Sequence, residues 1–284
     1  MTRSDPAILK YLYEEQGPRA KRITLIATAL SALLVIALLV QIILRFYKTG
    51  QLDRQYWFFF ARGTTWSFLA RGILGTIESS VLSGVVAFAL GFVFMLGRLS
   101  KSRIVRGISV SLIEFTRGVP TLLFIYFFFL GLPALGVKMS ALLKIALPVA
   151  LSASGVVAEV LRGGVNAVPN GQREAALSLG LSDWKTFVKI IFPQGFKYVI
   201  PALISEVVIV VKDTTFAYIV SFPDLMQNSK VLISNYDAML SVYLLVAVIY
   251  ILINYLLNKL SAFVAQNNGR KIGYGRNGNR TEAR

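Results

Sequence analysis

The stretch that decides the fold runs from Val168 to Pro193 and reads VPNGQREAALSLGLSDWKTFVKIIFP. It is polar, and it lies between apolar segments that are each long enough to cross a bilayer, which takes about 20 residues of helix. The pattern predicts two short helices joined by a tight turn. A polar helical hairpin between membrane spans is expected at the membrane surface, so this stretch indicates an integral membrane protein.

The first helix of the hairpin is predicted at about residues 172–179. Pro169 and Gly171 interrupt the preceding span, and Asn170 is expected to cap the helix, because its side chain can accept hydrogen bonds from the first free backbone amides. Gly180 is expected to end the helix, since glycine adopts the left-handed backbone conformation without steric cost.

The second helix is expected to begin after Ser182, whose hydroxyl is a common N-terminal cap. Asp183 then falls in the first turn, where a carboxylate interacts favourably with the helix dipole. Pro193 is expected to stop or kink the continuation. Ala175 and Ala176 are small, so we expect another protein to be able to approach the backbone of the first helix closely.

The composition is that of a membrane protein. The chain has 284 residues, of which 55% are hydrophobic, and its mean hydropathy is +0.64. It contains no Cys and no His, which removes disulfides, thiolate chemistry, the commonest general base and the commonest transition-metal ligand. A hydrolase or a metalloenzyme is therefore disfavoured, and no catalytic or metal-binding residues are predicted.

Hydrophobic runs predict an all-α transmembrane protein with about six spans. The segment between the first two spans is rich in Trp, Tyr and Phe, which favour the headgroup region, so we expect it to lie along the membrane surface. The six runs are Ile23–Leu44, Gly72–Leu96, Ile108–Leu130, Ala141–Leu161, Tyr198–Val220 and Met239–Phe263.

Lysine and arginine predict the orientation. The net charge of +16 is concentrated beside the spans, as in cytoplasmic loops, so we expect no nucleic-acid partner. With six crossings, the charge bias places both termini in the cytoplasm of a bacterial cell, with the chain in the cytoplasmic membrane. The predicted divisions are a cytoplasmic N-terminus (1–22), an extra span with the surface segment (23–71), a transmembrane domain (72–263) and a disordered basic tail (264–284).

The frame of the hairpin, Glu174-Ala175-Ala176 followed by Gly180, Ile190 and Pro193, closely resembles the "EAA" loop of membrane subunits of ABC-type importers. In that family the loop couples the permease to an ATPase. The resemblance implies the type I ABC importer permease fold, with Glu174, Ala175, Ala176, Gly180, Leu181, Ser182 and Asp183 as the ATPase-coupling residues.

Further elements resemble permeases for polar amino acids, and together they cover about residues 72–263. They are EFTRGVPT at 114–121, AEVLRGGV at 158–165, Pro193-Gln194 and VKDTT at 211–215. The small departures are Val119, Thr121 and Thr215, where the family pattern has Thr, Leu and Ser. The resemblance is nearest to glutamate and glutamine permeases that have an extra N-terminal span.

Charged residues within the spans are candidates for a substrate pathway, because an ionisable group in hydrocarbon is costly unless it is paired or hydrated. Glu159 and Arg162 lie three residues apart and suit a zwitterionic amino acid; the alternative is that Arg162 extends to the headgroups and neutralises Glu159. Lys212 and Asp213 are adjacent, so on a helix they face different ways and need separate partners. Two roles are open for them: lining the translocation pathway or fixing the interface with the partner permease subunit.

Two further candidates are weaker. Glu114 and Arg117 can pair on one helix, and the favoured interpretation is an ion pair that fixes a kink at Gly118 and Pro120. Glu78 lies in the second span near its outer end.

The resemblance implies a transport subunit rather than an enzyme. The chain has no phosphate-binding Gly-rich loop that ends in Gly-Lys-Ser/Thr, so no cofactor is expected on this chain, and ATP and Mg²⁺ would bind to two partner ATPase subunits. The remaining expected partners are a second, related permease subunit, an extracytoplasmic solute-binding protein and the lipid bilayer. The expected function is ATP-driven import of a polar amino acid, with L-glutamate as the preferred substrate. The alternative is a secondary amino acid transporter driven by an ion gradient.

Overall fold

A computed structural model describes residues 17–273 of the chain, with side chains described as far as Ala265. The described residues form helices connected by short turns and contain no β-strand. The chain divides after Trp57 into two units. The first unit contains α2 (Pro18–Lys48) and the short 3₁₀-helix η1 (Arg54–Tyr56). Helix α2 contains the first predicted span and begins at Pro18, whose ring suits the first turn of a helix.

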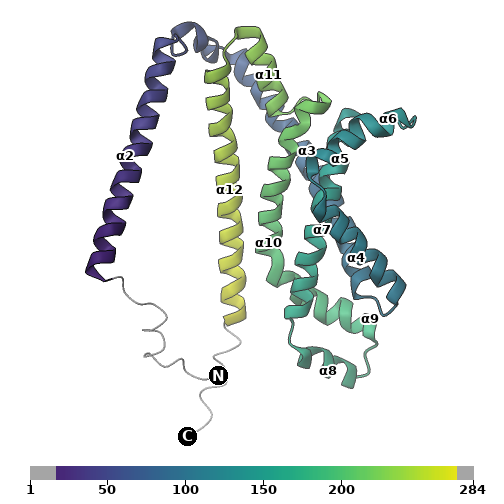
Figure 1. Cartoon of the computed structure of the whole chain (residues 1–284). Coiled ribbons are helices and arrows are strands. Elements are labelled where there is room, and N and C mark those ends of the chain that lie inside the picture. The colour runs from purple at the N-terminus through teal and green to yellow at the C-terminus, as the bar shows by residue number, and fades with distance from the viewer. Residues whose placement is uncertain (1–16, 274–284) are drawn as a thin grey trace. The chain divides into compact units, whose positions relative to one another are not determined.

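The second unit holds the remaining helices, and Figure 1 shows α8 and α9 at one end of it and α11 at the opposite end. In chain order the elements are η2 (Phe58–Ala61), α3 (Gly63–Leu99), α4 (Arg103–Gly118), α5 (Thr121–Tyr126), η3 (Phe127–Gly131), α6 (Leu132–Ala134), α7 (Ala141–Ala167), α8 (Asn170–Ser178), α9 (Asp183–Thr186), η4 (Phe187–Ile191), α10 (Phe192–Asp213), η5 (Thr214–Val220), α11 (Leu225–Tyr236) and α12 (Met239–Gly273).

Among the described residues, four helices are long and apolar enough to cross a membrane, or up to five if a bent pair forms one span. The four are α2, α3, α7 and α12, and the bent pair is α4 with α5 and α6. The predicted span Tyr198–Val220 lies in α10 and η5 and is not among them.

The predicted span Ile108–Leu130 is not one straight helix. Helix α4 ends at Gly118, and the two halves are bent by 97°. Val119 has an extended backbone, with φ −91° and ψ 126°, because a residue before proline is sterically pushed out of the helical region. Pro120 also lacks the N–H that would continue the helix. The predicted kink is therefore confirmed, but it is sharp enough to form a broken span or a re-entrant loop.

The second span begins earlier than predicted, because α3 starts at Gly63 rather than near Gly72. Just before it, η2 places Phe59 in a fully buried position, where its ring stacks on Tyr236 of α11 with centroids 4.3 Å apart. Part of the aromatic segment that was expected on the membrane surface is therefore packed against protein.

Helix α3 packs along α7 through small side chains, which let two helix backbones approach closely. At Gly91 of α3, an added Cβ would lie 2.7 Å from Cγ1 of Val157 on α7. The apolar cluster beside this contact contains Met95, Ile113, Val157, Ala158 and Leu161. Helix α7 is thus held at the centre of the unit.

Helices α7 and α10 cross at two glycines. A Cβ on Gly164 would lie 2.4 Å from the carbonyl oxygen of Gly195, and a Cβ on Gly195 would lie 2.7 Å from the carbonyl carbon and oxygen of Gly164. The crossing therefore requires glycine on both helices. At the C-terminal end, α12 continues to Gly273, and residues 274–284 of the predicted disordered tail lie outside the described residues.

Candidate functional site

The first part of the hairpin is a helix that ends in a left-handed glycine. Gly180 has φ +79°, and its N–H donates to the carbonyl of Leu177 at 2.9 Å, while the N–H of Leu181 donates to the carbonyl of Ala176 at 3.2 Å. These two bonds form a Schellman motif, which satisfies the last carbonyls of the helix. The predicted role of Gly180 in the turn is confirmed. The predicted cap was wrong by one position, because Pro169 occupies the N-cap of α8 and Asn170 is its first helical residue.

The second part is the short helix α9. Ser182 caps it, and its hydroxyl accepts from the N–H of Lys185 at 3.5 Å. Asp183 lies in the first turn, as predicted. Pro193 does not stop the chain: residues 187–191 form a π-helical turn and α10 follows directly. Pro193 lacks the N–H that an α-helix would bond to the carbonyl of Lys189, and the wider turn accommodates that loss.

The hairpin turns an apolar tip away from the rest of the protein. Leu179 is 84% exposed, and Trp184 is also exposed and stacks on Phe187 with ring centroids 5.8 Å apart. Glu174, Ala175, Ser182 and Asp183 are exposed, Leu181 is half-buried, and Gly180 has open space around its Cα. Ala176, in contrast, is only 5% exposed. Ala176 packs inward while Ala175 faces outward, because consecutive residues on a helix point in different directions.

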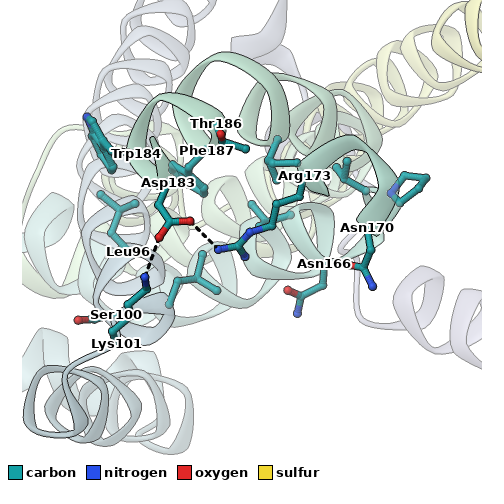
Figure 2. Close-up of a pocket in the computed structure, with 15 residues that line it drawn as sticks. Leu96, Ser100, Lys101, Asn166, Asn170, Arg173, Asp183, Trp184, Thr186 and Phe187 are labelled. Atoms are coloured by element: carbon teal, nitrogen blue, oxygen red, sulfur yellow. Dashed lines mark hydrogen bonds and ion pairs between the residues drawn. The ribbon is translucent and has the colours of Figure 1, made fainter. Parts of the chain in front are cut away.

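Asp183 ties the hairpin to two other parts of the unit (Figure 2). Its Oδ2 accepts from Nζ of Lys101 at 2.6 Å, and its Oδ1 pairs with an Nη atom of Arg173 at 3.3 Å. Lys101 lies in the turn between α3 and α4, and Arg173 is on α8. The Lys101 ammonium, followed by the Arg173 guanidinium, holds the pKa of the Asp183 carboxyl below its ordinary value. The carboxylate is therefore charged at neutral pH and can pair with both cations.

Beneath these contacts lies a cavity of about 670 Å³. Its apolar wall comes from the ends of α3 and α7 and from the second part of the hairpin, and its polar residues include Lys101, Arg173 and Asp183 (Figure 2). The cavity therefore has an apolar interior with charged groups beside it.

Glu159 is held between two arginines. Its Oε1 accepts from Nη1 of Arg98 on α3 at 2.6 Å, and its Oε2 accepts from Nη2 of Arg162 at 2.7 Å and from Nε at 3.1 Å. The three side chains are only partly exposed. Glu159 and Arg162 therefore form a bidentate contact, and Arg98 of α3 joins it.

The two weaker candidates are more exposed. Nη1 of Arg117 lies 3.7 Å from Oε1 of Glu114, and both side chains are about half exposed, so the pair is loose. It sits in the last turn of α4 before the bend, where the kink interpretation placed it. Glu78 is exposed on α3. Within residues 17–273 it forms no hydrogen bond or ion pair with the other candidates.

Asp213 joins three helices. Its Oδ2 accepts from Oγ1 of Thr121 at 2.9 Å, and that hydroxyl lies 2.9 Å from Oγ of Ser152 on α7. Thr121 is the first residue of α5, directly after the bend. Lys212 is exposed, whereas Asp213 is half-buried, so the prediction that the two face different ways is confirmed.

The sequence analysis missed Glu206, which lies two turns before Asp213 on the same face of α10. Glu206 is only 7% exposed. The rule that selected Asp213, an ionisable residue within an apolar run, would also have found it. Helix α10 therefore carries two carboxylates, two turns apart, on one face.

Within the part of the chain that the structure describes, no group of three or more Asp, Glu, His or Cys residues is placed to hold a metal ion. The chemistry that the side chains offer is ionic and hydrogen-bonding contact. The arrangement suits passage or docking of a polar group.

Comparison with known proteins gives one consistent match. The family model "Binding-protein-dependent transport system inner membrane component" matches residues 87–269. The glutamate transport system permease protein GluD of Corynebacterium glutamicum is 33% identical over 217 residues, which cover 75% of this chain and 80% of that protein. The glutamate/glutamine/aspartate/asparagine transport system permease protein BztC of Rhodobacter capsulatus is 38% identical over 201 residues, or 68% of this chain and 46% of that protein. A crystal structure of an amino acid ABC transporter with histidines has a TM-score of 0.68 at 26% identity and covers 74% of this chain and 98% of that chain.

Proposed function

This chain belongs to the family of binding-protein-dependent transport system inner membrane components, and from that premise we propose that it carries L-glutamate into the cytoplasm with energy from ATP hydrolysed on separate subunits. It is a permease of the amino acid ABC importer class, with the type I importer fold. The proposed assembly adds two ATPase subunits, a second related permease and an extracytoplasmic solute-binding protein.

The observation that carries the coupling part of this proposal is the exposed tip of the hairpin. Leu179 and Trp184 expose large apolar side chains on a segment of two short capped helices. Exposed apolar groups with polar neighbours are typical of a protein interaction site. The Schellman turn at Gly180 and the cap at Ser182 give the hairpin a defined shape, so a rigid partner can move it as one piece.

The contacts of the hairpin define how its movement would reach the membrane. It is continuous with α7 at one end and with α10 at the other, and Asp183 connects it to the turn between α3 and α4. We infer that closure of the ATPases moves α7, α10 and the turn between α3 and α4 together. The glycine crossing of α7 and α10 keeps the two helices in direct backbone contact during that movement.

Glutamate is supported by the relatives and by the charges of the chain. Two relatives carry glutamate in their names. Arg98 and Arg162 both contact Glu159, so two cations share one anion. This surplus of positive charge favours a substrate with carboxylate groups, since guanidinium holds carboxylate in a bidentate contact.

The α-ammonium group of the substrate needs the opposite charge. We assign that role to Asp213, whose carboxylate is held by Thr121 at the bend between α4 and α5. Glu206 lies further along the same face of α10. In this proposal the ammonium group of the amino acid binds to a protein carboxylate along the pathway, and its carboxylates bind to arginines.

The test is uptake into proteoliposomes that contain this chain with its co-purifying subunits and an added binding protein. Labelled glutamate, glutamine, arginine and histidine are supplied with and without internal ATP. We expect ATP-dependent uptake with glutamate preferred. Preference for arginine or histidine would refute the substrate assignment, and uptake driven by a sodium or proton gradient without ATP would replace the importer with a secondary transporter.

A further inference from the structure

The cavity beneath the hairpin has two chemically different parts. Its apolar wall includes Leu96 and Leu99 at the end of α3, Val165 at the end of α7, and Phe187 and Ile191 of η4. These residues lie next to the membrane-spanning parts of their helices. A cavity of about 670 Å³ is within the size range of ligand sites in proteins.

The charged part of the cavity is net positive. Lys101 and Arg173 both pair with Asp183, so two cations share one anion. The side chain of Lys101 is 86% exposed and that of Arg173 is more than half exposed, so each retains free N–H donors that face outward. An incoming anionic group can bind to these donors without first displacing Asp183.

The position of the cavity is that of the lipid headgroups. Helices α3 and α7 are among the candidate membrane spans, and they end at Leu99 and Ala167, at the edge of the cavity. Lipid headgroups lie at the ends of membrane spans, just outside the hydrocarbon core.

We propose that this cavity binds one anionic phospholipid, with its phosphate against Lys101 and Arg173 and an acyl chain along Leu96, Leu99 and Phe187. Basic pockets between membrane helices on the cytoplasmic side are a known form of lipid headgroup site. A soluble anion would leave the apolar wall uncovered. The leaflet follows from the proposed function, because the hairpin side is the ATPase side.

This lipid would act on the contacts that attach the hairpin. The phosphate and the carboxylate of Asp183 share the same two cations, so a bound lipid weakens the attraction of Lys101 and Arg173 for Asp183 without displacing it. We therefore expect the composition of the membrane to change the coupling of ATP hydrolysis to uptake. The binding itself does not depend on which amino acid is carried.

The binding experiment uses the whole complex in nanodiscs of phosphatidylcholine that contain a fraction of phosphatidylglycerol. Phosphatidylglycerol that stays bound to this chain is counted by native mass spectrometry after release from the nanodisc. The test variant is Lys101→Gln, and the matched control is Lys185→Gln, which removes the same charge from an exposed position of α9 that does not line the cavity. Lys101 is exposed, so its substitution leaves the fold intact.

We expect Lys101→Gln to reduce bound phosphatidylglycerol about fivefold, the usual effect of one basic residue on an anionic lipid, and Lys185→Gln to leave it unchanged. Equal binding by the two variants would overturn the proposal. Glycerol phosphate, which has no acyl chain, is not expected to displace the lipid, and displacement at millimolar concentration would reveal a site for free phosphate instead.

A photoreactive amino acid at Leu99 identifies the occupant directly. Cross-linking to phosphatidylglycerol supports the proposal, whereas cross-linking to an ATPase subunit overturns it. Neither the lipid count nor the cross-linking depends on transport. Both therefore test the lipid site equally well if the complex carries an amino acid other than glutamate. Failure of the lipid proposal and failure of the proposed function are thus separately observable.

Discussion

Replacing Gly164 by alanine is expected to disrupt the crossing of α7 and α10. The added Cβ would lie 2.4 Å from the carbonyl oxygen of Gly195 and 2.7 Å from Cγ1 of Val199, well short of the 3.4 Å at which ordinary van der Waals contact begins. The first of these neighbours is backbone, so no rotamer change relieves the clash. The two helices must move apart, and the packing of α7 against its neighbours is disturbed with them.

The neighbouring Gly163 supplies a matched control. A Cβ on Gly163 meets nothing within 4 Å. Both substitutions replace glycine by alanine within α7, and each gains about 0.5–1 kcal/mol from the higher helix propensity of alanine. That gain cancels in the comparison. The difference in unfolding free energy between the variants is therefore the cost of overpacking, about 1–3 kcal/mol.

The assay compares Gly163→Ala and Gly164→Ala in the assembled complex in nanodiscs. Thermal unfolding is followed by tryptophan fluorescence, and ATP hydrolysis and amino acid uptake are measured on the same preparations. We expect Gly164→Ala to unfold at a lower temperature and to transport less per ATP, and Gly163→Ala to match or exceed the unmodified chain. Indistinguishable unfolding temperatures would refute the backbone contact between α7 and α10.

Three further substitutions test other parts of the unit. Gly180→Val is expected to uncouple ATP hydrolysis from uptake without loss of membrane insertion, because φ +79° costs an ordinary residue about 1–2 kcal/mol; Gly180→Asn, which tolerates this conformation, should keep coupling in the same assay. Glu159→Gln removes the anion that pairs with both Arg98 and Arg162 and should lower the unfolding temperature, and the added change Arg98→Gln should restore part of the loss if charge repulsion is the cause. Burial raises the pKa of Asp224, the cap of α11, from 3.8 to about 6, so the folded state binds the proton more tightly and stability should fall as pH rises from about 4 to about 6; Asp224→Asn keeps a capping oxygen and should abolish this decline in thermal unfolding measured against pH.

The hairpin could be predicted in detail because its determinants are local. A glycine that must take a positive φ and a serine that accepts a backbone hydrogen bond are each specified by the residues beside them, and both Gly180 and Ser182 act as predicted. The cap of α8 was misplaced by one residue because Asn170 and Pro169 are both suited to a helix start, and local chemistry does not choose between them.

The contacts between helices could not be predicted, because hydrophobic periodicity gives the face of a helix but not its neighbour. Arg98 joins Glu159 from a position 61 residues away in the chain, and Thr121 reaches Asp213 only because the chain bends after Val119. Ala175 and Ala176 are the same residue type in adjacent positions. Only the packing of α8 shows that Ala176 is buried and Ala175 is exposed.

Local sequence and non-local packing both act where the hairpin joins the membrane helices. Local sequence makes a rigid two-helix segment, whereas non-local packing decides what that segment can move. Because Asp183 pairs with Lys101 beyond the end of α3, and because α7 and α10 touch through glycine backbone, a displacement of the hairpin cannot be absorbed by one flexible connection. The side chains of the ion pair can adjust by rotamer changes. The backbone atoms at the glycine crossing cannot, so that contact transmits a displacement more directly. The glycine crossing is therefore the point at which we expect a single methyl group to separate ATP hydrolysis from transport.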